Sequence, residues 1–452
     1  MCPTIFISAG EASGEHYGAL LIDELQRRLA AAGQSASFVG MGGDRMAAAG
    51  LRRIVRSEDM AVMGITEVVR HLPRIYREFQ KLKRAIAAHP PAIAVLIDFP
   101  DIHVKLAEQF HKLGVPVIFF VSPQLWAWKK HRIKLVQKYV TRMLVIFPFE
   151  EPFYREHGVN AEFVGHPLAE LPLPAIRRGQ FAAENDLNPA TTWIALLPGS
   201  RPKEIRDNLP EMLAAAQMLV ESLRGKGLSG KGTGFSPYIE PGDTAGLQSP
   251  RDAFQDVQTA ALQFLIPLAP TLNTAQRAQV RALVDESTSL SLHLVDDARA
   301  ALFHARVSIV ASGTATVEAA LIGNPFVVVY RVSPLTYAIA KRVVTVPHVA
   351  MCNLIAGKRV VPELIQNDFT AANIVQQIEP LLPDGAPRQS MMQELASIAG
   401  LLRPGQFGSS QPGKPTGAIE RVAAITMELL ETASPALDIA THKSRQRVRP
   451  TC

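Results

Sequence analysis

The feature that most constrains the fold of this chain is a repeated alternation of short apolar segments with longer segments of helical spacing. In the first repeat, apolar residues 4–8 lead through a glycine-containing turn to residues 17–31, where leucines recur about once per helical turn. Continuous apolar segments are typical of strands buried on both faces, and helices between them indicate parallel pairing. We therefore predict an α/β fold built from doubly wound parallel sheets.

The predicted strands fall into two sets, separated by a polar, proline-containing stretch at residues 169–190. Two such sets predict two Rossmann-like domains joined by a hinge, with a ligand cleft between them at the carboxyl ends of the strands. We assign residues 1–180 to the N-terminal domain and residues 190–400 to the C-terminal domain. The strands are predicted at residues 4–8, 37–40, 92–97, 115–121, 143–147 and 161–164, and then at 193–197, 263–267, 291–295, 307–311 and 326–330.

Three stretches depart from this rhythm. Residues 225–258 interrupt the C-terminal domain with a segment whose first part is rich in Gly, Ser and Pro, which predicts a flexible insertion. Residues 417–433 are predicted to form a C-terminal helix. Residues 434–452 are predicted to form a disordered basic tail.

Composition excludes several classes of protein. With 452 residues and 47% hydrophobic residues, the chain has ample material for a core and is not disordered throughout. Three scattered cysteines suit a reducing cytoplasm rather than a disulfide framework or a CxxC metal site. No apolar run is long enough to span a membrane, and no secretory signal is evident at the N-terminus. The chain has no P-loop motif, no G-x-G-x-x-G motif and no His/Cys cluster with metal spacing.

Two turns of the C-terminal domain have the composition of phosphate sites. The turn of Gly199, Ser200 and Arg201 follows a strand, so backbone N–H groups, a helix N-terminus and a guanidinium would meet an anion there. The turn of Ser312, Gly313 and Thr314 has the same context, and Glu318 one turn later suits two sugar hydroxyls. The alternatives are a plain turn at the first site and, at the second, a helix capped by Thr314. Together the two turns make a nucleoside diphosphate plausible.

Asp98 ends an apolar strand of the N-terminal domain, where a carboxylate would reach the predicted cleft. Partial burial there would raise its pKa, which suits a general base. The alternative is that Asp98 only caps the following helix.

Residues 61–84 interleave apolar and basic side chains, which suits a helix that binds anionic lipid at its surface. The alternative is a helix that packs its apolar face on the core and leaves its basic face in solvent. The residues that we expect at the membrane are Val68, Val69, Arg70, Leu72, Arg74, Ile75 and Arg77.

The formal net charge of +6 is unevenly distributed. Residues 70–84, 129–142 and 443–449 carry +5, +6 and +4, so the rest of the chain is net acidic. Two of these basic stretches lie in the N-terminal domain. Such patches suit an anionic membrane or a phosphorylated substrate, and no aromatic–basic signature of RNA binding accompanies them.

In their order and spacing, these motifs resemble the lipid-A-disaccharide synthase family over roughly residues 4–430. Each motif alone is weak, whereas the series is highly specific. The matching segments are residues 9–14 (AGEASG), 38–40, 61–64, 97–101 (IDFPD), 121–128 (VSPQLWAW), 147–150 (FPFE), 164–166, 197–201 (LPGSR), 312–315 with Glu318, 330–331 and 353–357 (NLIAG).

The resemblance implies a GT-B fold and an inverting glycosyltransferase without a catalytic metal or other cofactor. The implied reaction joins UDP-2,3-diacylglucosamine to 2,3-diacylglucosamine 1-phosphate and releases UDP. It also implies a cytoplasmic protein that is peripheral on the inner face of the inner membrane, and a homodimer with exchanged C-terminal segments.

Carried over residue by residue, the resemblance makes Asp98 the general base and Arg201 the group that stabilises the departing diphosphate. Nucleotide contacts are implied for Gly199, Ser200, Arg201, Ser312, Gly313, Thr314, Glu318 and Asn353, and the implied exchange of C-terminal segments would let Asn353 act across subunits. Acceptor contacts in the N-terminal domain are expected from Gly10, Glu11, Ser13, Ser122, Gln124 and Trp126. The chain departs from the family at Glu15, often Asp, and at His103, often Asn.

Two other functions remain open from the sequence. Another GT-B enzyme, such as a UDP-N-acetylglucosamine 2-epimerase, would share the nucleotide half, although residues 61–84 and 121–128 argue against it. The other alternative is a non-catalytic protein that binds a membrane surface. It predicts that Asp98→Asn leaves every measurable activity unchanged.

Overall fold

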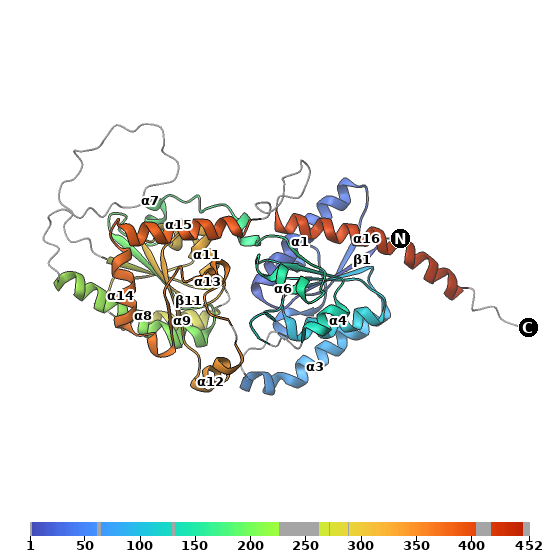
Figure 1. Ribbon diagram of the computed structural model, residues 1–452, viewed down its shortest axis with the longest axis horizontal. Coiled ribbons are helices and arrows are strands. Elements are labelled where there is room, and N and C mark those ends of the chain that lie inside the picture. The colour runs from blue at the N-terminus through green and yellow to red at the C-terminus, as the bar shows by residue number, and fades with distance from the viewer. Residues whose placement is uncertain are drawn as a thin grey trace, which may run out of the picture. The chain divides into compact units, whose positions relative to one another are not determined.

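The computed structural model of the chain describes residues 2–60, 65–128, 132–225, 262–270, 272–287, 289–344, 346–403 and 417–445. The chain divides into two compact units, Met1–Glu170 with Leu402–Cys452, and Leu171–Leu401. Each unit has a parallel sheet with helices on both faces (Figure 1). This confirms the predicted α/β class and the two doubly wound domains.

The sheet of the first unit has seven strands in the order β3-β2-β1-β4-β5-β6-β7, all paired in parallel. Because β1, β4 and β5 are neighbours, the turns that follow them gather at one edge of this sheet. The strands are β1 (Thr4–Ala9), β2 (Ser37–Gly42), β3 (Arg52–Arg56), β4 (Ile93–Ile97), β5 (Val117–Phe120), β6 (Arg142–Val145) and β7 (Ala161–Phe163).

Helices cover both faces of the first sheet, with α1 and α16 on one face and α3 and α4 on the other (Figure 1). The apolar sides of α3 and α4 pack on the strands through buried residues such as Leu82, Leu106 and Phe110. The helices are α1 (Ala12–Ala31), α2 (Asp44–Ala48), η1 (Ser57–Asp59), α3 (Ile65–Ala88), α4 (Pro100–Lys112), α5 (Ile133–Tyr139), α6 (Glu150–Glu156), η3 (Pro167–Glu170) and α16 (Ala418–Arg445).

The sheet of the second unit has six parallel strands in the order β10-β9-β8-β11-β12-β13. Here β8, β11 and β12 are neighbours, so the turns after these strands also gather at one edge. The strands are β8 (Thr192–Leu197), β9 (Leu262–Pro267), β10 (Leu292–Val295), β11 (Val307–Ala311), β12 (Phe326–Tyr330) and β13 (Glu363–Ile365).

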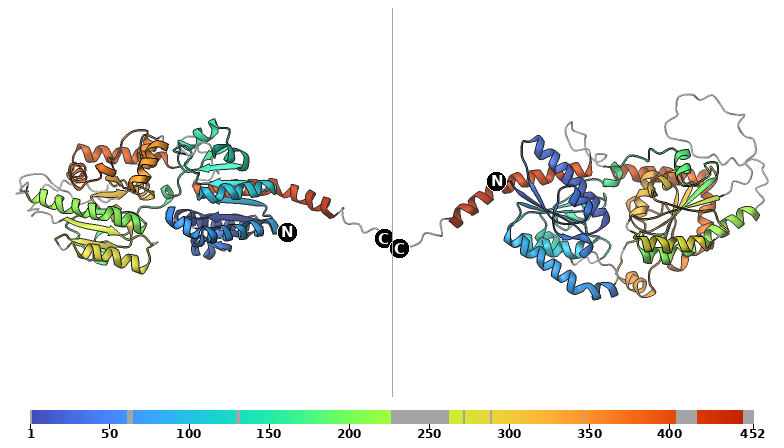
Figure 2. Two further views of the ribbon diagram at one scale, coloured as in Figure 1. Left: turned by 90° about the horizontal axis from the view of Figure 1, so that it is seen from below. Right: turned by 180° about the vertical axis from the view of Figure 1, so that it is seen from behind.

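In the second unit, α8 and α14 pack together, and α10, α11, α13 and α15 form a separate group of neighbouring helices. Figure 2 shows this unit from two further sides. The helices are α7 (Arg178–Glu184), α8 (Pro202–Gly225), α9 (Thr274–Asp285), α10 (Ala298–His304), α11 (Thr314–Ile322), α12 (Pro334–Val343), α13 (Met351–Ala356), η4 (Gln366–Asp368), α14 (Ala371–Ile378), η5 (Glu379–Leu381) and α15 (Ala386–Leu401).

The C-terminal helix belongs to the first unit rather than standing apart. α16 packs along α1, the Ala418 N–H donates to the Glu170 carboxylate, and Arg421 Nε donates to Glu162 Oε1 at 2.5 Å. The helix continues through Pro435 to Arg445, beyond the predicted end at residue 433 and into the segment predicted as a disordered tail. The predicted insertion lies outside the described residues, apart from Gly225 at the end of α8.

None of the described helices is long and apolar enough to cross a membrane.

Candidate active site

Asp98 and Phe99 form a strained turn directly after β4. Both residues adopt left-handed backbone conformations, with φ of 53° and 52°. Non-glycine residues in this region carry strain that the surrounding packing has to hold, and such strain is concentrated at functional sites. Phe99 rather than Asp98 is the N-cap of α4, and no side chain caps that helix. The alternative in which Asp98 only caps the helix is therefore wrong.

The Asp98 carboxyl group titrates close to neutral pH. It is half-buried, and burial together with the negative charge of Glu11 raises its pKa to about 7. The Phe99 N–H donates to this carboxyl and only partly opposes the shift. A carboxylate with a pKa near neutrality is well matched to accept a proton from a hydroxyl group.

The turn after β1 lies beside this turn because β1 and β4 are paired. A side-chain carbon added to Gly10 would lie 2.3 Å from Cγ of Phe99, so glycine at this position leaves room for the Phe99 ring. Glu11 is the N-cap of α1 with an extended backbone, and Ser13 lies half-buried in the first turn of the helix. The structure thus brings Gly10, Glu11 and Ser13 to the same sheet edge as Asp98.

Glu15, the residue at which the chain departs from the family, makes a contact of its own. Its Oε1 accepts a hydrogen bond of 2.9 Å from the Arg45 N–H, in the first turn of α2. A side-chain carbon added to Gly43 would lie within 2.4 Å of this carboxylate. The longer Glu side chain therefore reaches α2 and binds its N-terminus.

Ser122 and Trp126, expected to contact the acceptor, hold a buried carboxyl group. Ser122 Oγ donates to Glu150 Oε1 at 2.6 Å, and Trp126 Nε1 donates to the same oxygen at 2.9 Å. The Phe147 N–H donates to the other oxygen at 3.1 Å. Both predicted side chains are buried and their polar groups are used within the protein, so direct acceptor contacts from them stay a prediction. Their polar atoms point to Glu150 because a buried carboxyl needs donors.

The loop after β5 nevertheless remains part of the same sheet edge. Val121 has a φ of 62°, which is unusual for a β-branched residue, and it still donates its N–H to the Leu144 carbonyl at 3.1 Å. Gln124, the third residue predicted in this loop, is exposed. Of the three predicted residues, Gln124 alone presents its side chain at the surface.

In the second unit, the turn after β8 already holds a carboxylate. Glu204 Oε2 accepts from the N–H groups of Ser200 at 3.1 Å and Arg201 at 3.3 Å, and Oε1 accepts from Arg201 Nη1 at 3.1 Å. Gly199 has a φ of 126°, and a side-chain carbon there would lie 2.5 Å from Glu204 Oε2. Glu204 is the third residue of α8, so these contacts also fit a plain turn whose helix start is capped by its own carboxylate, and the phosphate site stays a prediction.

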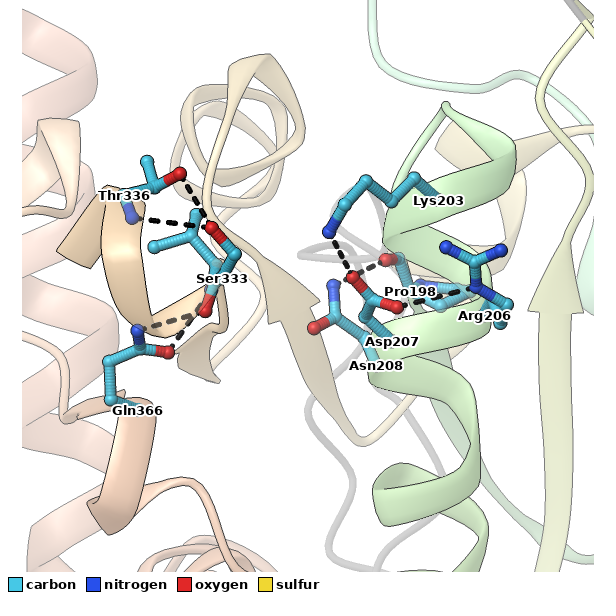
Figure 3. A network of polar contacts seen from close by, with 9 residues as sticks. Pro198, Lys203, Arg206, Asp207, Asn208, Ser333, Thr336 and Gln366 are labelled. Atoms are coloured by element: carbon cyan, nitrogen blue, oxygen red, sulfur yellow. Dashed lines mark hydrogen bonds and ion pairs between the residues drawn. The ribbon is translucent and has the colours of Figure 1, made fainter. Parts of the chain in front are cut away.

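Asn208 lies buried one turn further along α8. Its Nδ2 donates to the Pro198 carbonyl at 2.8 Å, which leaves its Oδ1 without a hydrogen-bond partner among the described residues. Figure 3 shows Oδ1 directed away from Pro198, while Lys203 and Arg206 pair with Asp207 on the outer side of the helix. A buried acceptor without a donor fits a hydroxyl or N–H group supplied by a ligand or a water molecule.

The turn after β11 leaves the N-terminus of α11 uncapped. Gly313 is the N-cap with φ 155°, no side chain caps the helix, and Thr314 is its exposed first residue. The alternative in which Thr314 caps the helix is therefore wrong. Ser312 donates its N–H to the Val329 carbonyl at 2.9 Å, which keeps β11 and β12 paired up to the turn. The free N–H groups of the first turn of α11 lie at the same sheet edge as Gly199.

Glu318 follows on α11 and is half-buried. Burial raises the pKa of its carboxyl, the positive charge of Arg299 opposes this shift, and Asp297 adds to it. Arg299 is half-buried, and among the described residues its buried Nη1 atom has no hydrogen-bond partner. The pair provides an acceptor and a donor for a polar ligand group.

The side-chain amide of Asn353 uses its hydrogen-bond donors and acceptors within the protein. It is fully buried, and its Nδ2 donates to the Val361 carbonyl at 2.9 Å and to Glu363 Oε1 at 2.8 Å. Its Oδ1 accepts from the N–H groups of Val360 at 2.7 Å and Val361 at 2.9 Å. An amide has two donor hydrogens and two acceptor positions, so all of them are used. The predicted nucleotide contact is corrected to a structural role that ties α13 to the segment before β13.

The predicted membrane surface on α3 is only partly described. Leu72 and Tyr76 are 55% and 63% exposed, whereas Ile75 is half-buried and packs against the core. Arg74 pairs with Asp59, and Arg77 pairs with Glu78 at 3.1 Å. The side chains of Val68, Val69 and Arg70 lie outside the described residues.

Prediction from sequence missed Glu150, Glu204 and Asn208. Glu150 stands in the FPFE motif, and Glu204 and Asn208 follow Arg201 by three and seven residues, at the spacing of one and two helical turns. Glu204 and Asn208 could therefore have been identified by their helical spacing from the turn at Arg201. No pattern in the sequence near Glu150 indicates that its side chain is buried. Among the described residues, no group of three His, Cys, Asp or Glu side chains is arranged to hold a metal ion.

Comparison with protein families gives a match over most of the chain. A family model described as Lipid-A-disaccharide synthetase matches residues 5–228 and 252–408, and the unmatched gap lies within the predicted insertion. A lipid-A-disaccharide synthase of Acidobacterium capsulatum is 55% identical over 439 residues, which cover 95% of this chain and 97% of the relative. A lipid-A-disaccharide synthase of Koribacter versatilis is 44% identical over 420 residues, which cover 93% and 98%.

Solved structures resemble the chain in fold alone. UDP-GlcNAc 2-epimerase from Neisseria meningitidis, bound to UDP-GlcNAc, has a TM-score of 0.53 at 12% identity and covers 94% of this chain and 99% of that one. The glycotransferase of kitacinnamycin has a TM-score of 0.54 at 13% identity, with coverage of 95% and 99%. These neighbours confirm the predicted GT-B fold.

Proposed function

The chain belongs to the lipid-A-disaccharide synthetase family, and from that membership we propose how its residues divide the reaction between them. The chain is a glycosyltransferase of lipid A biosynthesis that uses a UDP-sugar. The full reaction joins UDP-2,3-diacylglucosamine to 2,3-diacylglucosamine 1-phosphate and gives a β-1′,6-linked disaccharide 1-phosphate and UDP.

The proposed base is Asp98, and its strained, half-buried position with a pKa near 7 is the observation that carries this assignment. The 6-hydroxyl oxygen of the acceptor attacks the anomeric carbon of the donor, and the bond from that carbon to the diphosphate oxygen breaks with inversion. The hydroxyl proton passes to the Asp98 carboxylate. Because the base ionises near neutral pH, it both accepts the proton readily and is present in its active form.

The departing UDP carries the negative charge that develops in this step. The Ser200 and Arg201 N–H groups and the Arg201 guanidinium already bind the Glu204 carboxylate, and they offer the same contacts to diphosphate oxygen atoms. The uncapped N-terminus of α11 supplies further N–H donors, and Glu318 accepts from the ribose hydroxyls. In this assignment Arg201 and the two turns supply the charge stabilisation, so we expect the reaction to proceed in the presence of EDTA.

A transfer assay tests this proposal. The protein is incubated with UDP-2,3-diacylglucosamine and 2,3-diacylglucosamine 1-phosphate, and mass spectrometry measures disaccharide 1-phosphate and UDP. Asp98→Asn should lower the rate by at least about 100-fold. Asp23→Asn, an exposed position on α1, makes the same change in charge and should leave the rate unaltered.

Other outcomes of this assay separate the competing functions. UDP release without disaccharide, or an epimerised free sugar, would contradict the transferase mechanism and favour the epimerase. A product rate that is unchanged in Asp98→Asn would remove Asp98 from the chemistry.

The acylated substrates imply that the protein works at a membrane surface, for which α3 is our candidate. Leu72 and Tyr76 expose apolar surface beside the basic side chains of Arg74 and Arg77. Such a segment can insert apolar side chains among lipid headgroups while its cations bind anionic lipid. We propose that this helix docks the protein on the inner face of the inner membrane.

The homodimer with exchanged C-terminal segments stays part of the proposal. In the single chain, α16 packs on α1 and ties to Glu162 and Glu170 of the same unit. Exchange between two copies would place the same contacts between subunits. Sedimentation velocity measures the mass, and a monomer at micromolar concentration would contradict the dimer.

A further inference from the structure

A buried histidine supports the backbone of the Asp98–Phe99 turn. His103 lies one turn into α4, has no exposed surface, and points its Nδ1 to the Asp98 carbonyl oxygen at 2.5 Å. Its Nε2 lies 2.8 Å from the hydroxyl oxygen of Ser8, which is equally buried in β1. The ring therefore bridges β1 and the turn after β4.

The partners of His103 determine its protonation. A carbonyl oxygen only accepts, so Nδ1 carries the hydrogen and donates to Asp98, and Nε2 then accepts from the Ser8 hydroxyl. Burial lowers the pKa of His103 to about 4, so the ring is neutral at physiological pH. Each ring nitrogen thus has one partner, and neither is available to a substrate.

Packing holds the ring in this orientation. The Phe99 and Phe119 rings both meet His103 edge to face, with centroids 5.7 Å and 6.1 Å from that of the imidazole. Phe99 in turn fills the space left open by Gly10. The two residues with strained backbones, Asp98 and Phe99, are therefore each held by His103, one through its carbonyl and the other through its ring.

We propose that His103 is a positioning residue for the transfer reaction, which holds the Asp98–Phe99 turn in its strained conformation and thereby the Asp98 carboxylate in its working place. This inference rests on the proposed role of Asp98 as the base. A left-handed turn of two non-glycine residues relaxes when its anchor is removed, because both residues hold strained backbone conformations. Relaxation would displace the carboxylate, and a displacement of about 1 Å can cost about 100-fold in rate.

Two substitutions at His103 separate its two hydrogen bonds. In His103→Asn, the amide Nδ2 takes the place of the ring Nδ1 and can still donate to the Asp98 carbonyl. In His103→Gln, the amide reaches the place of Nε2 and can contact Ser8, but no donor remains near Asp98. We expect His103→Asn to keep kcat within about threefold, and His103→Gln to lose about 10- to 100-fold in kcat.

Further measurements distinguish positioning from general damage. The KM for the UDP-sugar and the Kd for UDP should stay within about threefold in both variants, because the phosphate turns belong to the other unit. Thermal unfolding shows whether each variant is folded. If His103→Gln does not fold, His103→Leu takes its place, since it fills the space without a donor.

The outcomes distinguish this inference from the proposed function. If Asp98→Asn is inactive while folded His103→Gln keeps its kcat, only the positioning role is overturned. An equal fall in kcat for His103→Asn and His103→Gln would also overturn it, because the donor to Asp98 would then make no difference. If Asp98→Asn itself keeps its activity, the proposed base fails, and the role of His103 fails with it.

Discussion

Asp98 and Glu150 are two carboxyl groups whose pKa burial raises to about 7, but their surroundings differ. Glu150 is 1% exposed and accepts hydrogen bonds from Ser122, Trp126 and Phe147. Asp98 is half-buried on a strained turn, and the Phe99 N–H is the one donor that opposes its shift. Glu150 therefore organises a loop, whereas Asp98 has the accessibility that a base requires.

The pH dependence of the reaction should follow the ionisation of Asp98. Below a pH of about 7 the raised pKa keeps the carboxyl protonated and unable to accept a proton. We expect kcat/KM to fall about tenfold per pH unit on the acid side and to level off above pH 7. Glu11→Gln removes the negative charge that helps to raise this pKa, so the acid limb should move to lower pH. If the acid limb of the pH profile stays at the same pH in Glu11→Gln, the charge of Glu11 does not raise the pKa of Asp98.

Glu150 should make stability depend on pH in a defined direction. Because its folded-state pKa is raised from 4.5 to about 7, the folded state retains a proton that the unfolded state has lost between these pH values. The free energy of unfolding should therefore fall as pH rises through this window, by at most about 1.4 kcal/mol per pH unit. Denaturant titrations should show a smaller fall in Glu150→Gln. Glu156→Gln, an exposed position on the same helix, should retain the full pH dependence of the native chain.

The contrast between Asp98 and Ser122 shows how far residues could be predicted from sequence. Both follow apolar strands, and both were expected at the acceptor site. Asp98 lies directly after its strand, in a turn of two residues with left-handed backbones, as its place in the sequence indicates. The direction of Ser122 depends on Glu150, which lies 28 residues away in sequence. Nothing local to the strand end indicates where such a distant partner will lie.

At the scale of elements, the turn and the helix after β8 should act together. The Glu204 carboxylate competes with a diphosphate for the N–H groups of Ser200 and Arg201. Glu204→Gln removes the negative charge, so UDP should bind about threefold more tightly as measured by isothermal titration calorimetry. Asp207→Asn makes the same charge change on the same helix, where Asp207 pairs with Lys203 and Arg206, and should bind UDP like the native chain. Weaker binding in Glu204→Gln would indicate that Glu204 instead holds Arg201 for the diphosphate.

The α3 helix gives a second prediction at this scale. Replacing Arg70, Arg74 and Arg77 by Ser should weaken binding to vesicles that contain anionic phospholipid, by about 1 kcal/mol for each cation that lies near the surface. Leu72→Ser with Tyr76→Ser should weaken binding to the same vesicles without a change in charge, since both side chains are exposed. Co-sedimentation with vesicles measures both effects.

A matched control removes three cations elsewhere. Arg27, Lys112 and Arg155 lie exposed on other helices, and their replacement by Ser should leave vesicle binding closer to that of the native chain. Equal losses in the two triple variants would mean that net charge, and not α3, determines the binding.

The strands that sequence patterns missed, β3 and β13, are both edge strands. Each predicted strand is present with its ends within two residues, but β3 and β13 were not predicted. β3 reads Arg-Arg-Ile-Val-Arg, and β13 has three residues, so neither shows the continuous apolar run of a strand buried on both faces. An edge strand has one paired side and tolerates charge, and its formation depends on the neighbouring strand. The other two edge strands, β7 and β10, are predicted, so the pattern describes the interior and one edge of each sheet.

At the scale of the whole molecule, the order of the strands explains which site residues come together. Gly10, Asp98 and Gln124 follow three neighbouring strands of one sheet, and Gly199 and Gly313 follow two neighbouring strands of the other. Parallel strands place their carboxyl ends at one edge, so a parallel topology alone gathers these turns. Asn353 lies on α13 instead, and its environment depends on packing that strand order does not determine. That difference accounts for the one nucleotide assignment that the structure corrects.

Because each unit has its own sheet and its own cluster of turns, nucleotide binding and proton transfer should be separable by mutation. Arg201→Ala removes a charged donor from the phosphate turn, so UDP binding should weaken by about tenfold or more. Asp98 lies in the other unit, so the Asp98→Asn variant should bind UDP as the native chain does. Its transfer rate should still fall by at least about 100-fold. Titration calorimetry with UDP and the transfer assay measure the two quantities on the same samples. If Asp98→Asn weakened UDP binding as much as Arg201→Ala does, the assignment of nucleotide and base to separate units would be wrong.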